Sequence, residues 1–73
     1  MSAKDLIEQI VMDKPTLSRE EVSEVSGLQV QTLAKLAMDR KGPPMIKLGR
    51  ACRYPRPGVV DWMARNAMVP TVL

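Results

Sequence analysis

The stretch Ser18–Leu36 constrains the fold most, because its residues predict where two helices begin and end. Ser18 stands three residues before Glu21, the spacing at which each side chain bonds the other's backbone N–H and starts a helix. Gly27 falls where that helix must stop, since glycine tolerates the left-handed conformation of a helix end. A second helix is predicted over about Gln29–Met38, so two short helices flank a tight turn.

Both predicted helices have an apolar and a polar side. The inward positions are Leu17 and Val22 as an apolar staple, Val25 and Leu28 beside them, and Leu33, Leu36 and Ala37 on the second helix. The outer positions, left for solvent or phosphate, are Arg19, Glu20, Ser23 and Glu24, then Gln31, Ala34, Lys35 and Met38. Such a pair is typical of a DNA-binding helix-turn-helix, and an ordinary helical hairpin is the alternative.

A basic hairpin is predicted directly behind the helix pair, over Ile46–Tyr54. Alternation places Ile46, Leu48, Cys52 and Tyr54 on an apolar side, with Lys47 and Arg53 on a cationic side. Gly49 suits the tight turn, and Arg50 beside it is expected to project from the tip. A hairpin in this position is a wing, whereas a solvated hairpin that caps the core is the alternative.

Three further segments frame these elements. Ser2–Met12 is predicted as an extra helix that Lys14-Pro15 ends. The apolar stripe of this helix is expected to pack on its own domain, and self-association is the alternative; the stripe consists of Leu6, Ile7, Ile10 and Val11. Arg40–Pro44 is predicted as a loop. Pro57–Ala67 is predicted as a closing helix, in which Val59, Val60, Trp62, Met63 and Ala67 are available for burial. The apolar tail Met68–Leu73 is expected to be loose or to dock on a neighbouring copy.

Charge is distributed unevenly along the chain. Residues 1–34 carry three cations and six acids, a net charge of −3, while residues 35–73 carry eight cations and two acids, a net charge of +6. The excess of positive charge thus lies in the half of the chain that contains most of the second helix, the hairpin and the closing helix. Cations on these elements are where a DNA footprint is expected.

Composition argues against catalysis and against a membrane or secreted protein. A chain of 73 residues, 45% of them hydrophobic, suits one small domain. There is no histidine, one cysteine and no glycine-rich phosphate loop, so we expect no enzyme activity, no metal and no cofactor. Cys52 is expected to be a small core residue. The absence of a signal peptide, a disulfide pair or a long apolar run predicts a cytoplasmic, nucleoid-associated protein.

Three runs in this order resemble the small MerR-type winged-helix proteins of phages and integrative elements, the excisionases and AlpA-like prophage regulators. They are L-S-x-E-E-V at Leu17–Val22 with S-G-L at Ser26–Leu28, G-R-x-x-R-Y at Gly49–Tyr54, and V-x-D-W-M at Val59–Met63. The chain departs from the family pattern at Gln29, Val30, Gln31 and Ala34, and at Pro57-Gly58. The resemblance, which spans Ser18–Met63, implies a winged helix-turn-helix. With the extra helix predicted from the N-terminal pattern, we expect one domain: residues 1–14 the N-terminal helix, 16–67 the winged-helix core and 68–73 the tail.

Duplex DNA is the partner that these features predict together. The second helix is expected in the major groove, and the hairpin at phosphates or in the adjacent minor groove. The candidate contacts are Arg19, Gln29, Gln31, Thr32, Lys35, Lys47, Arg50, Arg53 and Arg56. The resemblance implies an excisionase-like factor whose copies bind side by side, bend attachment-site DNA and direct an integrase. A transcription regulator of a mobile element and a small protein-binding adaptor are the alternatives.

Overall fold

A computed structural model describes residues 2–67 as four helices and a three-stranded antiparallel sheet. The elements in chain order are α1 (Ala3–Ile10), β1 (Thr16–Leu17), α2 (Arg19–Ser26), α3 (Val30–Met38), β2 (Ile46–Leu48), β3 (Ala51–Pro55) and α4 (Arg56–Asn66). The mainly helical class with a small hairpin is therefore confirmed. No helix within residues 2–67 has the length and apolarity needed to cross a bilayer. The tail Met68–Leu73 lies outside the described residues.

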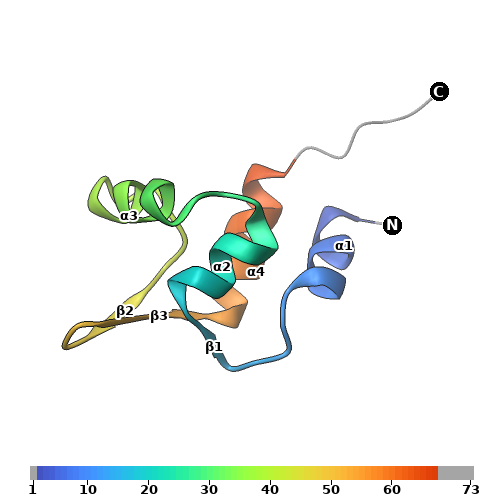
Figure 1. The fold of residues 1–73 in the computed structure, drawn as a ribbon. Coiled ribbons are helices and arrows are strands. Elements are labelled where there is room, and N and C mark those ends of the chain that lie inside the picture. Colours follow the sequence, from blue (N-terminus) through green and yellow to red (C-terminus); the bar gives the residue numbers. More distant parts are fainter. Residues whose placement is uncertain (1, 68–73) are drawn as a thin grey trace.

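The elements are arranged along one direction (Figure 1). α3 and the turn between β2 and β3 form one side of the molecule, and α1 lies on the opposite side with α2 and α4 between them. The strand order is β1-β3-β2, so β3 is the central strand. This arrangement leaves one face of α3 and the hairpin end uncovered by the other helices of the described chain.

The predicted helix boundaries around Ser18 and Gly27 are confirmed. Ser18 Oγ accepts from the Glu21 N–H at 3.1 Å, and a Glu21 carboxylate oxygen accepts from the Ser18 N–H at 2.9 Å. Gly27 ends α2 with φ 78°, in the left-handed region. α1 begins with the same kind of reciprocal cap, between Ser2 and Asp5. Local sequence chemistry thus sets three of the helix ends.

The turn between α2 and α3 uses serines that the sequence analysis did not assign to it. The Ser23 hydroxyl donates to the Leu28 carbonyl, and the Leu28 N–H donates to Ser26 Oγ at 3.2 Å. Ser23 was expected to face solvent or phosphate, and that expectation is wrong. A three-residue turn leaves backbone groups without helical partners, and nearby hydroxyls satisfy them.

The hairpin is present, but its predicted division into an apolar and a cationic side is wrong. Ile46 pairs with Arg53, Lys47 with Cys52, and Leu48 with Ala51. Paired residues share a face, so Lys47 lies on the side of Cys52, and Ile46 and Leu48 lie on the other side with 49% and 62% of their surface exposed. The reason is the turn: only Gly49, at φ 60°, and Arg50 separate the strands, and a two-residue loop sets this register.

A third strand, β1, was not predicted. Thr16 pairs with Pro55 and Leu17 with Tyr54, which joins the segment after α1 to the end of the hairpin. Two residues are too few to produce a detectable alternation in the sequence. The pairing nevertheless brings two fully buried side chains, Leu17 and Tyr54, into the centre of the fold.

The core contains side chains from nearly every element. Its buried members are Ile7, Val11, Leu17, Val22, Leu33, Tyr54, Val59 and Val60. Met63 and Cys52 pack against it and are partly buried, as expected for small or flexible apolar residues, and Trp62 is half-buried rather than enclosed. Ala67 was expected to be available for burial and is exposed.

Only half of the apolar stripe of α1 is buried. Ile7 and Val11 are buried, whereas Leu6 and Ile10 remain 39% and 57% exposed. The helix also ends at Ile10, four residues before the predicted stop at Lys14-Pro15. The Arg56 guanidinium, which donates to the carbonyls of Glu8 and Met12, explains the early end, because a tertiary contact satisfies carbonyls that a longer helix would use.

The helix end at Gly27 can be tested by a substitution series. No heavy atom lies within 4 Å of the place where a Cβ would stand, so the cost of any side chain there comes from the backbone conformation alone. We expect Gly27→Ala to destabilise the fold by about 1 kcal/mol, Gly27→Asn by less and Gly27→Val by more. Urea denaturation followed by circular dichroism would rank the variants. Equal stability of the alanine variant and the parent would contradict the prediction.

Candidate nucleic-acid interface

One face of α3 is open to solvent while its opposite face is anchored in the core. Leu33 is fully buried, and Gln31, Thr32 and Lys35 are exposed. These three positions share a face because residues three and four apart are neighbours on a helix. Gln29 is exposed at the start of α3, where its side chain makes no capping hydrogen bond. Four of the predicted contact residues are therefore accessible on one helix.

The hairpin flanks α3 and encloses a shallow groove with it. Ala34, Ala37 and Met38 of α3 line this groove together with Lys47 and Cys52 of the hairpin. A second hollow lies nearer the hairpin end, between the starts of α2 and α3 and strand β3; it is lined by Ser18, Arg19, Glu20, Val30 and Arg50 to Arg53. Lys47 and Arg50 thus border the two hollows next to α3, and both are exposed.

Arg19 is part-buried, lines both hollows and is hydrogen-bonded to Tyr54. Its Nε donates to Tyr54 Oη at 3.0 Å, and its Nη2 lies 3.5 Å from Cys52 Sγ and 3.6 Å from Met45 Sδ. The hydrogen bond to Tyr54 raises the pKa of the guanidinium above its ordinary value, while burial acts in the opposite direction. Arg19 was predicted to hold the DNA backbone. In the structure its Nε and Nη2 groups donate to side chains of β3 and so link α2 to that strand.

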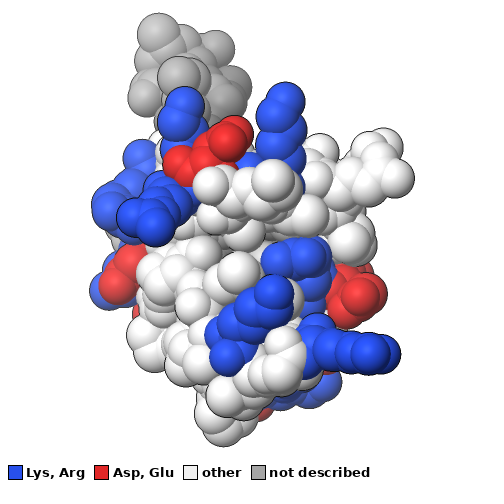
Figure 2. Space-filling view, turned by 90° about the vertical axis from the view of Figure 1, so that its left-hand side faces the viewer, with Lys and Arg blue, Asp and Glu red and all other residues white. Residues whose placement is uncertain are grey.

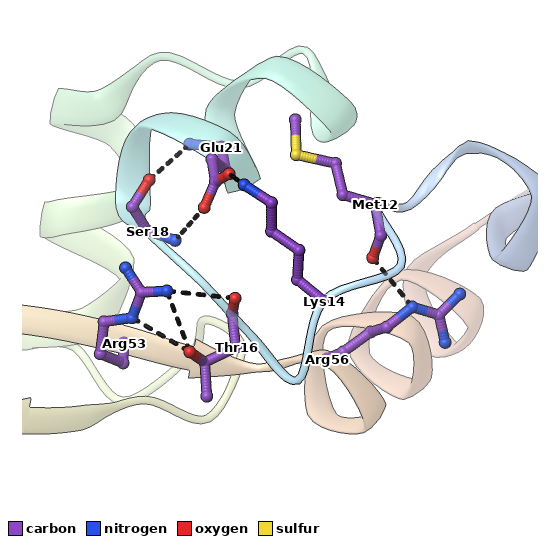
Figure 3. Close-up of polar contacts among 7 residues, drawn as sticks. All are labelled: Met12, Lys14, Thr16, Ser18, Glu21, Arg53 and Arg56. Atoms are coloured by element: carbon purple, nitrogen blue, oxygen red, sulfur yellow. Dashed lines mark hydrogen bonds and ion pairs between the residues drawn. The ribbon is translucent and has the colours of Figure 1, made fainter.

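Arg53 and Arg56 are also occupied by internal contacts (Figure 3). The Arg53 guanidinium donates to Thr16 Oγ1 at 3.0 and 3.1 Å and to the Thr16 carbonyl at 3.2 Å. Arg56 donates to the Met12 carbonyl at 3.0 Å and to the Glu8 carbonyl at 3.2 Å. Both side chains fasten the segment between α1 and α2, and a cation at the C-terminal carbonyls of α1 is also favoured by the helix dipole.

The remaining cations beside α3 have no partner within residues 2–67. The two ion pairs found there use other lysines: Lys14 with Glu21, and Lys4 with Asp61 at 3.8 Å. Lys35, Lys47 and Arg50 make no such contact. Figure 2 shows lysines and arginines spread over the side formed by α3 and the hairpin end, with acidic side chains at its left and right and, in the upper part, between basic side chains. One acid, Glu20, lines the same hollow as Arg50.

Three more cations were counted in the basic half of the sequence but were not among the predicted contact residues. Arg40 and Lys41 follow α3, and Arg65 lies in the last turn of α4; all three are exposed. Arg40 and Arg65 line one hollow together with Ala37 and Pro44. The run of cations after Met38 was visible in the sequence, but its assignment to a loop gave no reason to connect it with Arg65, which lies far along the chain.

Comparison with protein-family models, curated proteins and solved structures finds no match to this chain. Within residues 2–67, no group of three His, Cys, Asp or Glu side chains is placed to hold a metal ion. The function proposed below therefore rests on the geometry of the described residues and on the family resemblance of the sequence.

The division between anchored and free cations can be tested by stability measurements. Arg53→Ala removes charge-assisted hydrogen bonds that join β3 to β1, so we expect a loss of about 1–3 kcal/mol in the free energy of unfolding. Lys47→Ala on the neighbouring strand removes an exposed side chain without a partner and should change it by less than about 0.5 kcal/mol. Urea denaturation of both variants would show the difference. Two equally stable variants would mean that the Arg53 contacts add nothing.

A second prediction concerns Glu21 and pH. The hydrogen bond from Lys14, with that from the Ser18 N–H, lowers the pKa of this carboxyl from 4.5 to about 2. Because the folded-state pKa is the lower one, the carboxylate stabilises the fold above about pH 4.5, and this contribution is lost as the pH falls toward 2. Glu21→Gln should therefore be less stable than the parent at pH 7, and the gap should close near pH 2.

Urea midpoints at the two pH values would measure that gap. Glu24→Gln, on an exposed position of the same helix, is the matched control and should show little effect at either pH. A gap for Glu21→Gln that stays constant with pH would disprove the proposed role of its ionisation.

Proposed function

We propose that this protein is a winged helix-turn-helix protein that binds double-stranded DNA. One observation carries the proposal: α3 and the hairpin lie on the same accessible side of the molecule. On that side Lys35, Lys47 and Arg50 are exposed and unpaired within the described chain. A cationic helix and a cationic hairpin side by side match the geometry of a duplex, whose phosphates follow both grooves.

In this proposal α3 enters the major groove, which admits an α-helix. Gln31 and Thr32 would contact base edges, and the glutamine amide can bond adenine through two hydrogen bonds. Gln29 would contact bases or phosphate from the start of the helix. Lys35, one turn further along, would hold a phosphate and so set the position of the helix without reading sequence.

The hairpin would lie against the neighbouring phosphates or in the minor groove. Arg50 is in the turn that projects from the molecule, and Lys47 borders the groove with α3. A narrow minor groove has a strong negative potential that favours arginine. Arg19, Arg53 and Arg56 have an indirect role here, because their internal hydrogen bonds hold the hairpin and α2 in place for the contact.

The biological role that we propose is that of an excisionase-like factor, and the family resemblance of the sequence supports it. In this role several copies bind adjacent sites, bend the DNA and direct an integrase. The exposed Leu6 and Ile10 of α1 offer an apolar contact to such a neighbouring protein. Stepwise binding to multi-site DNA by a protein that is monomeric alone would favour this role, while a closed dimer on one palindrome would favour a transcription regulator.

We expect salt-sensitive DNA binding that depends on the α3 and hairpin cations. With three to six cations at phosphates, the logarithm of affinity should fall against that of salt with a slope of about −3 to −5. Lys35→Ala and Arg50→Ala should each weaken binding to all duplexes and make this slope shallower by about 0.9. Gln31→Ala should cost about 1–3 kcal/mol at the preferred site only. Fluorescence anisotropy across a salt series would provide all of these values.

The matched control is Lys4→Ala, which removes the same charge from α1 on the far side of the molecule. It should leave affinity and salt slope near those of the parent. Circular dichroism must show unchanged helicity in every variant. No binding to any duplex, or equal losses for Lys4→Ala and Arg50→Ala, would reject the proposed interface.

A further inference from the structure

Arg40 occupies a backbone position that normally belongs to glycine. Its φ is 57°, and within residues 2–67 it is the one residue other than glycine with positive φ. The Arg40 N–H donates to the Ala37 carbonyl at 3.2 Å, and the Lys41 N–H donates to the Leu36 carbonyl at 2.9 Å. These two bonds form the helix ending in which a left-handed residue, most often glycine, follows the cap. A residue with a Cβ is disfavoured there.

Several contacts fix the turn that carries Arg40. The Trp62 indole N–H of α4 donates to the Lys41 carbonyl at 2.9 Å. A Cβ on Gly42 would stand 3.1 Å from Leu36 Cβ, so this glycine allows the loop to pack closely on α3. A Cβ on Gly58 would likewise meet Pro44 at 3.1 Å, which shows the loop in close contact with α4. The backbone beneath Arg40 is therefore held from both helices.

Three exposed cations lie at this turn and at the end of α4, and we call them the α3-end cluster: Arg40, Lys41 and Arg65. Arg40 and Arg65 line one hollow, and none of the three makes a hydrogen bond or ion pair through its side chain in the described part of the chain. Two acids lie near these cations: Asp39 precedes Arg40 in the chain, and Asp61, one turn before Arg65 on α4, lines a hollow with Arg65 and pairs with Lys4 at 3.8 Å. The cluster is thus a group of three cations without a direct ion pair in the described residues, at the opposite end of α3 from Gln29.

We propose that the α3-end cluster binds a DNA phosphate, with Arg40 as its central contact. The inference rests on the proposed DNA binding and adds a second fixed point, so that α3 is held at both ends across the groove. A guanidinium can bond two phosphate oxygens at once. A pre-fixed backbone lowers the entropy lost on binding. A disfavoured conformation that the surrounding contacts impose is also a feature of functional positions.

The test uses a substitution that should raise the stability of the fold and lower the affinity for duplex DNA. Arg40→Gly relieves the left-handed backbone and removes the guanidinium, so its urea midpoint should rise above that of the parent. Its affinity for duplex DNA should fall about threefold to tenfold, with a salt slope shallower by about 0.9. Arg40→Asn tolerates the same conformation without charge and should show the same binding loss. Arg40→Lys keeps a charge and should retain the slope of the parent.

A scan of the duplex with single methylphosphonate groups, which remove one phosphate charge at a time, identifies the contact. At the phosphate bound by Arg40, the parent should lose affinity and Arg40→Gly should lose none. Parent-like affinity and slope for Arg40→Gly would overturn this inference and leave the proposed DNA binding intact, since the parent binds in the same assay. A lower urea midpoint would overturn the strain argument, and no duplex binding by the parent would overturn both proposals.

Discussion

The buried Tyr54 is the point on which the rest of this structure depends. Its side chain is fully enclosed, its strand lies between the other two, and its hydroxyl accepts from Arg19 of α2. Through these contacts β3 ties the helix pair to the hairpin and, by pairing with Leu17, to the segment after α1. A chain of this size has a small core, so a single residue that joins α2, β1 and β3 has a large effect on their relative positions.

The cations of the chain serve two different purposes. Arg19, Arg53 and Arg56 bond to a hydroxyl or to backbone carbonyls inside the molecule, and they align the elements around Tyr54. Lys35, Lys47, Arg50 and the α3-end cluster are exposed and unpaired within residues 2–67. The sequence pattern treats all of these residues alike, since each is a positive charge on or near a predicted docking element. Only their surroundings separate a residue that organises the interface from one that is available to a ligand.

Much of the fold and part of the candidate site could be predicted because the signals are local. The Ser18–Glu21 cap, the stop at Gly27 and the turn at Gly49 each depend on a few adjacent residues. The exposed face of α3 likewise follows from helical spacing around Leu33. The prediction of the hairpin faces was wrong because the strand register depends on whether the loop has two or three residues. A shift of the register by one residue moves each side chain to the other face. β1 was missed because a strand of two residues is too short to show an alternation of apolar and polar residues.

The sequence by itself determined where the helices start and stop, that a basic hairpin follows the helix pair, and that positive charge accumulates in the second half of the chain. These properties depend on backbone propensities and composition, which neighbouring residues fix. The tertiary structure decided which cations are free, which face of the hairpin is covered, and that Arg40 and Arg65 share one surface. Those properties depend on contacts between residues distant in the chain, and such contacts exist only when packing has brought the elements together.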